Sequence, residues 1–290
     1  MRLMLPGCIR TVRLEPLLQG SFPLPGISSP VCRGTTARRL VASWLACAAA
    51  ATVVHTSAFG QIPDIVSAVM RAQYGPSKHA SAGCWVHGTA DLGRYCMKPV
   101  QQQVVATQDG SRVYILAEGL SMNGDGAIQE IGAHAAPGLV GAFAVALTES
   151  GAGASPMWRL IAASKDLRLG SFGRAGASAA KFIRLGPSDY YGWTFVTGGT
   201  WQGISVGSHV ILAPLGARFA NLSTIPSMTE DDQQHRFDIA VDDTVEHVKV
   251  YPLVVTRSRV GEAKITGPAA QPKTVPFDDR RWRYAWPASQ

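Results

Sequence analysis

The feature that most restricts the fold is a succession of short apolar segments separated by turn signals, which runs from about residue 98 to residue 257. Segments of this length and spacing are typical of antiparallel β-strands. The expected strands are Val100–Thr107, Arg112–Glu118, Gly138–Leu147, Met157–Ala163, Lys181–Leu185, Tyr191–Thr197, Thr200–Val206, Val210–Ala213, Arg236–Asp242 and His247–Arg257. The sequence therefore predicts a mainly β fold, an antiparallel β-sandwich or barrel.

One short helix is expected before the strands, over residues 62–74. Its apolar residues recur at three- and four-residue spacing and form one stripe. Pro63 suits the first turn, and Gly75 and Pro76 end the helix. Behind the strands, residues 272–290 are rich in proline and charge, and we expect an extended tail that packs loosely or wraps an edge of the sheet.

The first 60 residues carry the pattern of a secretory signal peptide. Arg38-Arg39 precedes a 15-residue apolar run, Leu40–Val54, and small residues follow. This run is short for a membrane span, which takes about 20 residues. We expect cleavage after Ala58 or Gly60 and export to the periplasm or the extracellular space. The remaining chain, with no linker or fixed repeat, is expected to form one mainly β domain without a membrane span.

Two cysteines remain after the expected cleavage, Cys84 and Cys96. In an oxidising compartment such a pair predicts a disulfide, here in a loop that follows the helix. It would contribute roughly 3 kcal/mol by the chain-entropy model. Two free thiols, or half of a metal site, are the alternatives. The spacing lacks the CxxC pattern that zinc sites favour, so no metal is expected.

The formal charge of +7 lies mostly in the leader. Residues 1–60 hold six arginines and one acidic residue, whereas the other 230 residues hold 21 basic and 19 acidic side chains. A nucleic-acid-binding protein needs a concentrated basic face. The near balance of charge after residue 60 therefore argues against nucleic acid as a partner.

One motif suggests catalysis. Gly203–Gly207 matches GxSxG, the pattern around the nucleophile of α/β-hydrolases, with Ser205 at its centre. Asp242 and His247 follow in the order that such a triad needs. In those enzymes, however, the serine lies on a tight turn between a strand and a helix, and no helix is expected after Ser205.

The local pattern around this motif predicts a hairpin. Gly198-Gly199 resembles a two-residue turn, and counting outward from it pairs Trp193 with Ile204 and places Ser205 opposite Gly192. A serine inside a regular strand has neighbouring amides that are committed to the ladder. We therefore expect Ser205 not to be a nucleophile.

Aromatic residues cluster in one strand and its neighbour. Tyr190, Trp193 and Trp201 could stack on sugar rings, which makes a carbohydrate-binding module an alternative function. Tyr191, Trp193 and Phe195 alternate with smaller residues, as one buried face of a strand should. The alternation favours a role in the core.

The remaining polar patterns do not predict a metal or cofactor site. Asn123–Gly126 resembles the start of a calcium loop but lacks the further ligands and a suitably placed closing glutamate, so a plain turn is expected. The histidines after residue 60 form neither HxH nor HExxH pairs. We therefore expect an exported protein whose role is non-catalytic binding or envelope association. The sequence does not identify its ligand; an envelope glycan and a protein ligand are the possible partners, and a serine hydrolase is the main alternative.

Overall fold

We describe a computed structural model of the chain, covering residues 62–76, 78–79, 82–129, 135–148, 157–201, 204–229, 235–259 and 271–286. The leader 1–60, with its expected signal peptide, therefore lies outside the described residues. All described residues belong to one compact unit, residues 55–290. For residues 200, 201, 204, 205, 229 and 259, the backbone is described but the side chain is not.

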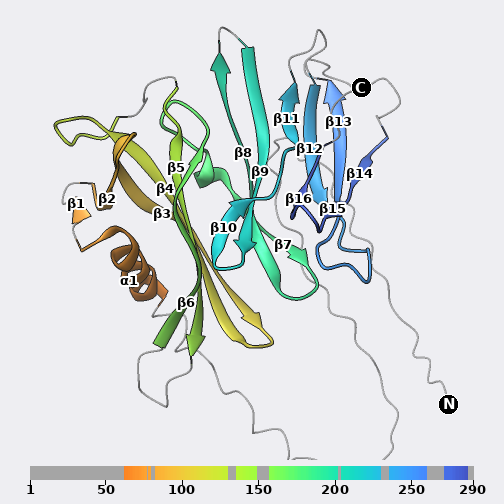
Figure 1. Cartoon of the computed structure of the whole chain (residues 1–290), viewed down its shortest axis with the longest axis horizontal. Helices are drawn as coiled ribbons and strands as arrows, with labels where there is room; N and C mark the ends of the chain where they lie inside the picture. The colour runs from red at the N-terminus through yellow and green to blue at the C-terminus, as the bar shows by residue number, and fades with distance from the viewer. Residues whose placement is uncertain are drawn as a thin grey trace, which may run out of the picture. The chain divides into compact units, whose positions relative to one another are not determined.

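The fold is mainly β, as predicted, with one N-terminal helix and antiparallel sheets (Figure 1). The first sheet is a meander in which β1 to β6 pair in chain order, and the second has the order β14-β13-β12-β11-β9-β8-β7, with β10 also paired to β9. β15 and β16 form a separate two-stranded ribbon. The first-sheet elements are α1 (Ile62–Tyr74), β1 (Lys78–His79), β2 (Cys84–Thr89), β3 (Gly93–Thr107), β4 (Gly110–Met122), β5 (Gly138–Thr148) and β6 (Met157–Leu169). The others are η2 (Ala177–Ala179), β7 (Lys181–Gly186), β8 (Tyr190–Trp201), β9 (Ile204–Leu215), β10 (Arg218–Asn221), β11 (Pro226–Thr229), β12 (His235–Val241), β13 (Leu253–Arg259), β14 (Lys273–Val275), β15 (Phe277–Asp278) and β16 (Arg283–Tyr284).

The helix α1 forms where its apolar stripe predicts it and covers one face of the first sheet (Figure 1). Its buried side chains pack on residues of β2 to β5. Gly75 ends the helix with φ at 93°, a left-handed conformation that glycine adopts without steric cost. The hydroxyl of Tyr74 donates to the carbonyl of Lys165 at 2.9 Å, and Gly141 leaves the space that this hydroxyl occupies.

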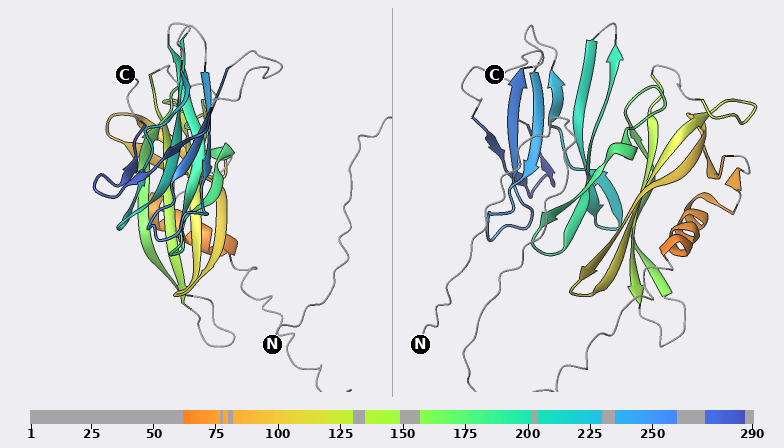
Figure 2. Two further views of the ribbon diagram at one scale, coloured as in Figure 1. Left: turned by 90° about the vertical axis from the view of Figure 1, so that its right-hand side faces the viewer. Right: turned by 180° about the vertical axis from the view of Figure 1, so that it is seen from behind.

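Strands β4 and β5 are buried on both faces because each face of the first sheet is covered. Along β4, Val113 and Ile115 face α1, whereas Tyr114 and Leu116 face the second sheet. This division follows from the two-residue period of a strand. The opposing layer comes mainly from β8 and β9, and Trp193 and Phe195 of β8 belong to the buried cluster between the sheets. Figure 2 shows the two sheets from further sides.

A further core lies on the other side of β9, under the C-terminal part of the chain. Ile211 and Ala213 of β9 face it together with residues of β12, β13 and β14. The tail wraps the edge of this sheet, since β14 pairs with β13. The described part of the tail is anchored at Tyr284, which has no exposed surface and whose hydroxyl donates to the carbonyl of Tyr251 at 2.7 Å.

The predicted turn at Gly198-Gly199 is wrong. Strand β8 continues to Trp201, so that Trp193 pairs with Leu212 and Ser205 pairs with Thr200. The two glycines serve a close approach instead of a turn: Ser171 donates to the carbonyl of Gly198 at 3.0 Å, and a Cβ atom on Gly199 would overlap the Ser171 hydroxyl. The partner of Trp193 is Leu212 instead of the predicted Ile204, which is an even number of residues away. Residues predicted to share a face of the sheet therefore still share it.

The structure differs from the expected strands in three further places. The segment before β13 is not a strand, because residues 243–252 form turns and bends, and His247 has φ at 61°. The short strands β10 and β11 were missed. The cysteines lie in strands β2 and β3 rather than in a loop. The pairing of β11 with β9 joins segments that are separated by β10, whereas β9 with β10 and β2 with β3 are adjacent hairpins whose turns were not recognised from the sequence.

The predicted disulfide is confirmed, with 5.4 Å between the Cα atoms of Cys84 and Cys96. Both cysteines are fully buried in the β2–β3 hairpin. Replacing both by alanine should lower the free energy of unfolding by about 2–4 kcal/mol, because the unfolded chain gains the entropy of an open loop. Urea unfolding with and without a reductant measures this. The reductant should destabilise only the unsubstituted protein, and an equal effect on both proteins would contradict the explanation.

The buried imidazole of His209 predicts sensitivity to acid. Its Nε2–H donates to the carbonyl of Phe237 at 2.7 Å, and burial lowers the pKa of this histidine below its usual value. The unfolded chain then binds the proton more readily, so the free energy of unfolding should fall as the pH drops below about 6.5. Each unit by which the pKa is lowered corresponds to about 1.4 kcal/mol.

Urea unfolding between about pH 7.5 and pH 5 measures this dependence. His209→Gln should flatten it, since glutamine can donate to the same carbonyl and carries no titrating group. Part of the slope should remain, because the pKa of His87 is also lowered, first by burial and then by nearby Lys165. An unchanged slope in the variant would show that His209 is not its source.

Candidate functional site

The residues of the GxSxG hypothesis do not converge in this fold. Ser205 lies in β9, which continues as a strand to Leu215. Across the second sheet, Gly207 pairs with Met228 and Met228 with Arg236, so the Ser205 end of β9 lies level with the start of β12.

Asp242 and His247 follow the opposite end of β12. At about 3.3 Å per residue, the separation from Ser205 along the strands exceeds about 20 Å. A nucleophile and its base must lie within hydrogen-bond reach, roughly 2.6–3.2 Å. His247 is in addition almost fully exposed, with its nearest carboxylate on the adjacent Glu246. The backbone register therefore gives no support to a Ser-His-Asp arrangement.

The aromatic cluster forms part of the core. Trp193 is fully buried, and Tyr190 is half-buried with its hydroxyl donating to the carbonyl of Pro214 at 2.8 Å. Tyr191 stacks on Phe182 with 5.6 Å between the ring centroids. The side chain of Trp201 lies outside the described residues. None of the described rings offers a fully exposed flat face to a sugar.

Asn123–Gly126 forms a turn, in which the side-chain oxygen of Asn123 accepts from the amide of Ala127 at 2.7 Å. Among the residues that the structure describes, no three His, Cys, Asp or Glu side chains come together as metal ligands would. The same part of the chain contains no helix with the length and apolarity that a membrane crossing requires.

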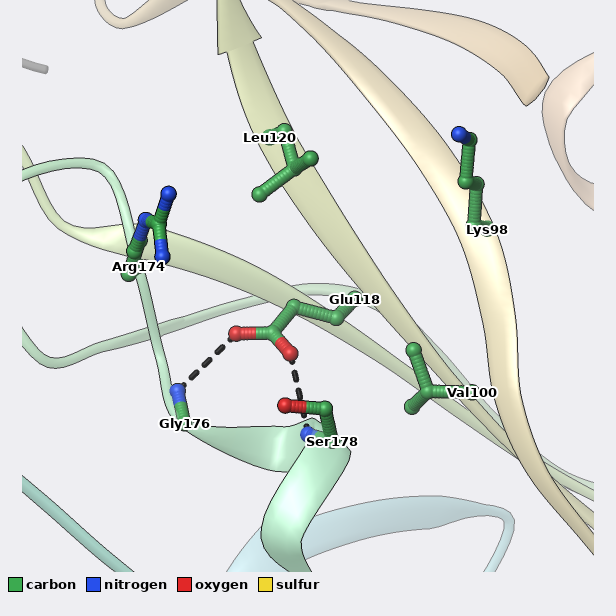
Figure 3. A pocket seen from close by; sticks show the side chains of 7 residues that line it. All are labelled: Lys98, Val100, Glu118, Leu120, Arg174, Gly176 and Ser178. Carbon is green, nitrogen blue, oxygen red and sulfur yellow. Dashed lines mark hydrogen bonds between the residues drawn. The ribbon is translucent and has the colours of Figure 1, made fainter. Parts of the chain in front are cut away.

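A pocket opens where the first sheet meets the segment that carries η2 (Figure 3). Its volume is about 300 Å³, at the lower end of the range for small-molecule sites. One wall comes from β3, the floor from β4, and the other wall from residues 174–178. The lining residues are Lys98, Val100, Glu118, Leu120, Arg174, Gly176 and Ser178.

Among the described residues that line this pocket, Glu118 is the one carboxylate, and its oxygens accept hydrogen bonds from backbone amides. One oxygen accepts from Ala175 at 3.0 Å and from Gly176 at 2.9 Å, and the other accepts from Ser178 at 2.9 Å (Figure 3). The side chain is only 8% exposed. Three N–H donors satisfy a buried carboxylate in place of water. Glu118 therefore holds the 175–178 segment against β4.

Gly138 of β5 also helps to hold the 175–178 segment against the first sheet. Gly138 lies so close to the backbone of Arg174 and Ala175 that a Cβ atom would overlap the Ala175 nitrogen. Gln101 of β3 donates a further side-chain hydrogen bond to the carbonyl of Ala180. The wall of the pocket is thus fixed to β3, β4 and β5 by side chains and close packing rather than by strand pairing.

Lys98 stands opposite Glu118 in the β3–β4 ladder. Side chains directly opposite in an antiparallel pair share one face of the sheet. The Glu118 carboxylate nevertheless turns to the 175–178 amides, and no ion pair between the two residues is observed. Lys98, which is half-buried as a residue, therefore contributes an ammonium group without an ion pair to the pocket lining.

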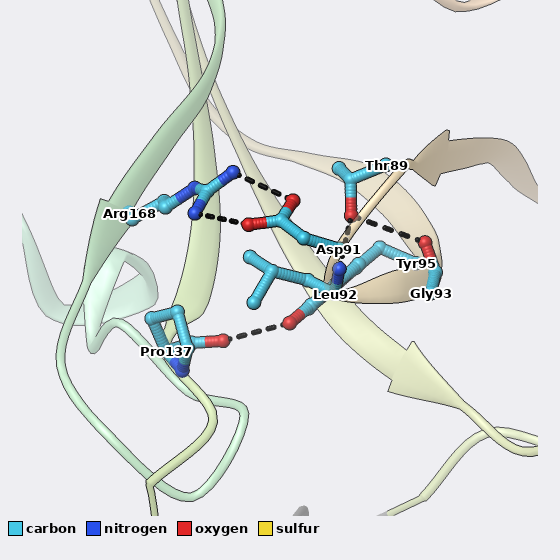
Figure 4. Close-up of polar contacts among 7 residues, drawn as sticks. All are labelled: Thr89, Asp91, Leu92, Gly93, Tyr95, Pro137 and Arg168. Atoms are coloured by element: carbon cyan, nitrogen blue, oxygen red, sulfur yellow. Dashed lines mark hydrogen bonds and ion pairs between the residues drawn. The ribbon is translucent and has the colours of Figure 1, made fainter.

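A second polar cluster joins the β2–β3 turn to β6 (Figure 4). Arg168 donates two hydrogen bonds to the carboxylate of Asp91, at 2.7 and 2.8 Å, and these bonds lower the pKa of Asp91. Tyr95 donates to the carbonyl of Pro137 at 2.9 Å, and Thr89 caps the turn at Leu92. Both charged groups are about half exposed and pair with each other. This cluster connects strands and leaves no unpaired charged group for a ligand.

No protein family, curated protein or solved structure matches this chain. The candidate site therefore depends on its own geometry. Neither Lys98 nor Glu118 was among the residues that the sequence pointed to. The available signal was a glutamate that directly follows the apolar run Val113–Ala117, because a buried acid needs a specific partner.

Proposed function

We propose that this chain is an exported, disulfide-bonded β-protein that binds a ligand outside the cytoplasm without catalysing a reaction. The observation that carries the proposal is the pocket beside η2, in which Glu118, the carboxylate among the described lining residues, accepts hydrogen bonds from three backbone amides. A general base must have a lone pair directed at the substrate. Glu118 directs its oxygens at the protein, and the pocket is left with binding groups.

Export is supported by the sequence pattern of the leader and is compatible with the Cys84–Cys96 disulfide. The intact mass of the protein recovered from the culture medium or periplasm tests it. The expected mass corresponds to a chain that begins near Phe59 or Gln61. A mass that still includes Leu40–Val54 would overturn the proposed processing.

The binding role is tested by ¹H–¹⁵N NMR titration of the full exported protein with a library of neutral, cationic and anionic fragments. Binding should shift the amides of Val100, Leu120 and Ser178 around the pocket. The exposed end of the β12–β13 connection, including His247, serves as the internal reference. If fragments of every charge leave the pocket amides unshifted, the proposed function is wrong.

The hydrolase alternative has its own test. A fluorophosphonate probe should not label the protein, and Ser205→Ala should leave the fold and binding unchanged, because β9 continues as a strand past Ser205. Covalent labelling that disappears in Ser205→Ala would give the hydrolase function priority. The envelope glycan or protein ligand expected from the sequence remains among the candidate partners.

A further inference from the structure

The pocket beside η2 has an uneven distribution of charge. Lys98 and Arg174 bring two cations to its walls, and Glu118 brings one anion. In the ladder Lys98 faces Glu118, which would ordinarily neutralise it. The glutamate instead accepts three hydrogen bonds from the 175–178 segment, so its negative charge is already stabilised by amide dipoles.

Lys98 is left without a counter-ion. Among the described residues, no ion pair or hydrogen bond of its ammonium group is observed, although the side chain is half-buried. An ammonium group with no counter-ion attracts an anion more strongly beside apolar surface than in open water, because the effective dielectric constant is lower there. Arg174 has another interaction, so the inference depends on Lys98.

The remaining surface of the pocket is apolar at two points. Val100 extends from β3 two residues beyond Lys98, and Leu120 extends from β4 two residues beyond Glu118. In Figure 3, Leu120 lies between Arg174 and Lys98, and Val100 lies below Lys98. A ligand that fills the pocket therefore meets the cationic side chains of Lys98 and Arg174 and the branched aliphatic side chains of Leu120 and Val100.

We propose that this pocket binds a small organic anion, whose acidic group pairs with Lys98 and whose short apolar part contacts Val100 and Leu120. The inference rests on the proposed binding function and adds the chemical class of the ligand. The cavity of about 300 Å³ suits a molecule of a few carbon atoms with one carboxylate or phosphate group.

Three probes of equal chain length test the class: hexanoate, hexan-1-ol and hexylamine, each titrated against the full exported protein by ¹H–¹⁵N NMR. Hexanoate should shift the amides of Val100, Leu120 and Ser178 with a Kd at least about tenfold lower than that of the other two. Lys98→Gln should raise the Kd of hexanoate at least about tenfold. Lys181→Gln, at an exposed lysine of β7, is the matched control and should leave the Kd unchanged.

A second measurement covers the case in which Lys98→Gln perturbs the fold. Raising the ionic strength from about 0.05 M to about 0.5 M should weaken hexanoate binding to the unsubstituted protein and leave hexan-1-ol unaffected. If hexan-1-ol or hexylamine binds at the same amides as tightly as hexanoate, the anion assignment is wrong while the binding function stands. The anion assignment is also wrong if neither salt nor Lys98→Gln weakens hexanoate binding. If no fragment of the wider library binds, both the anion assignment and the binding function are wrong.

Discussion

Glu118→Ala should lower the free energy of unfolding by about 3–5 kcal/mol. The substitution removes the acceptor of three backbone amides, those of Ala175, Gly176 and Ser178. Glu118 is only 8% exposed, so little water is available to replace it. Each amide that stays shielded from water then loses its hydrogen bond without compensation. Urea unfolding measures the change, and amide hydrogen exchange at residues 175–178 should show lost protection.

Two further variants separate this effect from loss of charge. Glu118→Gln keeps one side-chain oxygen for Ala175 and Gly176 but turns its NH₂ group toward the Ser178 amide, so it should cost less than Glu118→Ala. Glu246→Ala, at a carboxylate that is 86% exposed, should have no measurable effect. A Glu118→Ala variant as stable as the unsubstituted protein would contradict the structural role of this glutamate.

Trp193→Ala should also destabilise the protein by about 3–5 kcal/mol. Trp193 has no exposed surface and contacts the rings of Tyr114, Phe182 and Phe219 in the layer between the sheets. Its removal leaves a large cavity that surrounding strands cannot close, because their backbones are fixed in ladders on both sides. The midpoint and slope of urea unfolding measure the loss.

The matched control for Trp193→Ala is Val196→Ala, on the same strand. Val196 is 51% exposed, so its truncation should change the free energy of unfolding by less than about 0.5 kcal/mol. Equal effects of the two substitutions would mean that the interior of β8 does not carry the packing that the burial indicates. A small effect of Trp193→Ala would reopen the carbohydrate-binding alternative for this aromatic cluster.

The sequence predicted the elements whose patterns are local. The helix 62–74 was found from its stripe, and its bounds agree with α1. The expected strands Val100–Thr107 and Arg112–Glu118 flank a four-residue turn signal, Gln108-Asp109-Gly110-Ser111, and β3 and β4 meet there as a hairpin. In both cases the hydrophobic period and the adjacent turn residues specify the same structure, so local information is sufficient.

Prediction failed where a pattern had two structural explanations. Gly198-Gly199 fits a two-residue turn, yet the same glycines also fit a strand that another segment approaches closely, here Ser171. His247 fits an alternating strand, but it lies in the connection between β12 and β13. Only the pairing of β9 with β8 and of β13 with β12 selects between these explanations.

By itself, the sequence determined the mainly β fold, the helix that precedes it and the pair of cysteines that form the disulfide, because each depends on periodicity or on residue type. The tertiary structure decided the candidate site. Lys98 and Glu118 are neighbours through the β3–β4 register, and residues 175–178 reach Glu118 from 57 to 60 positions away in the chain. Backbone amides bind Glu118, and amides are present at every position except proline, so the sequence does not indicate which residues will bind this glutamate. That Lys98 has no counter-ion therefore follows only from the folded structure.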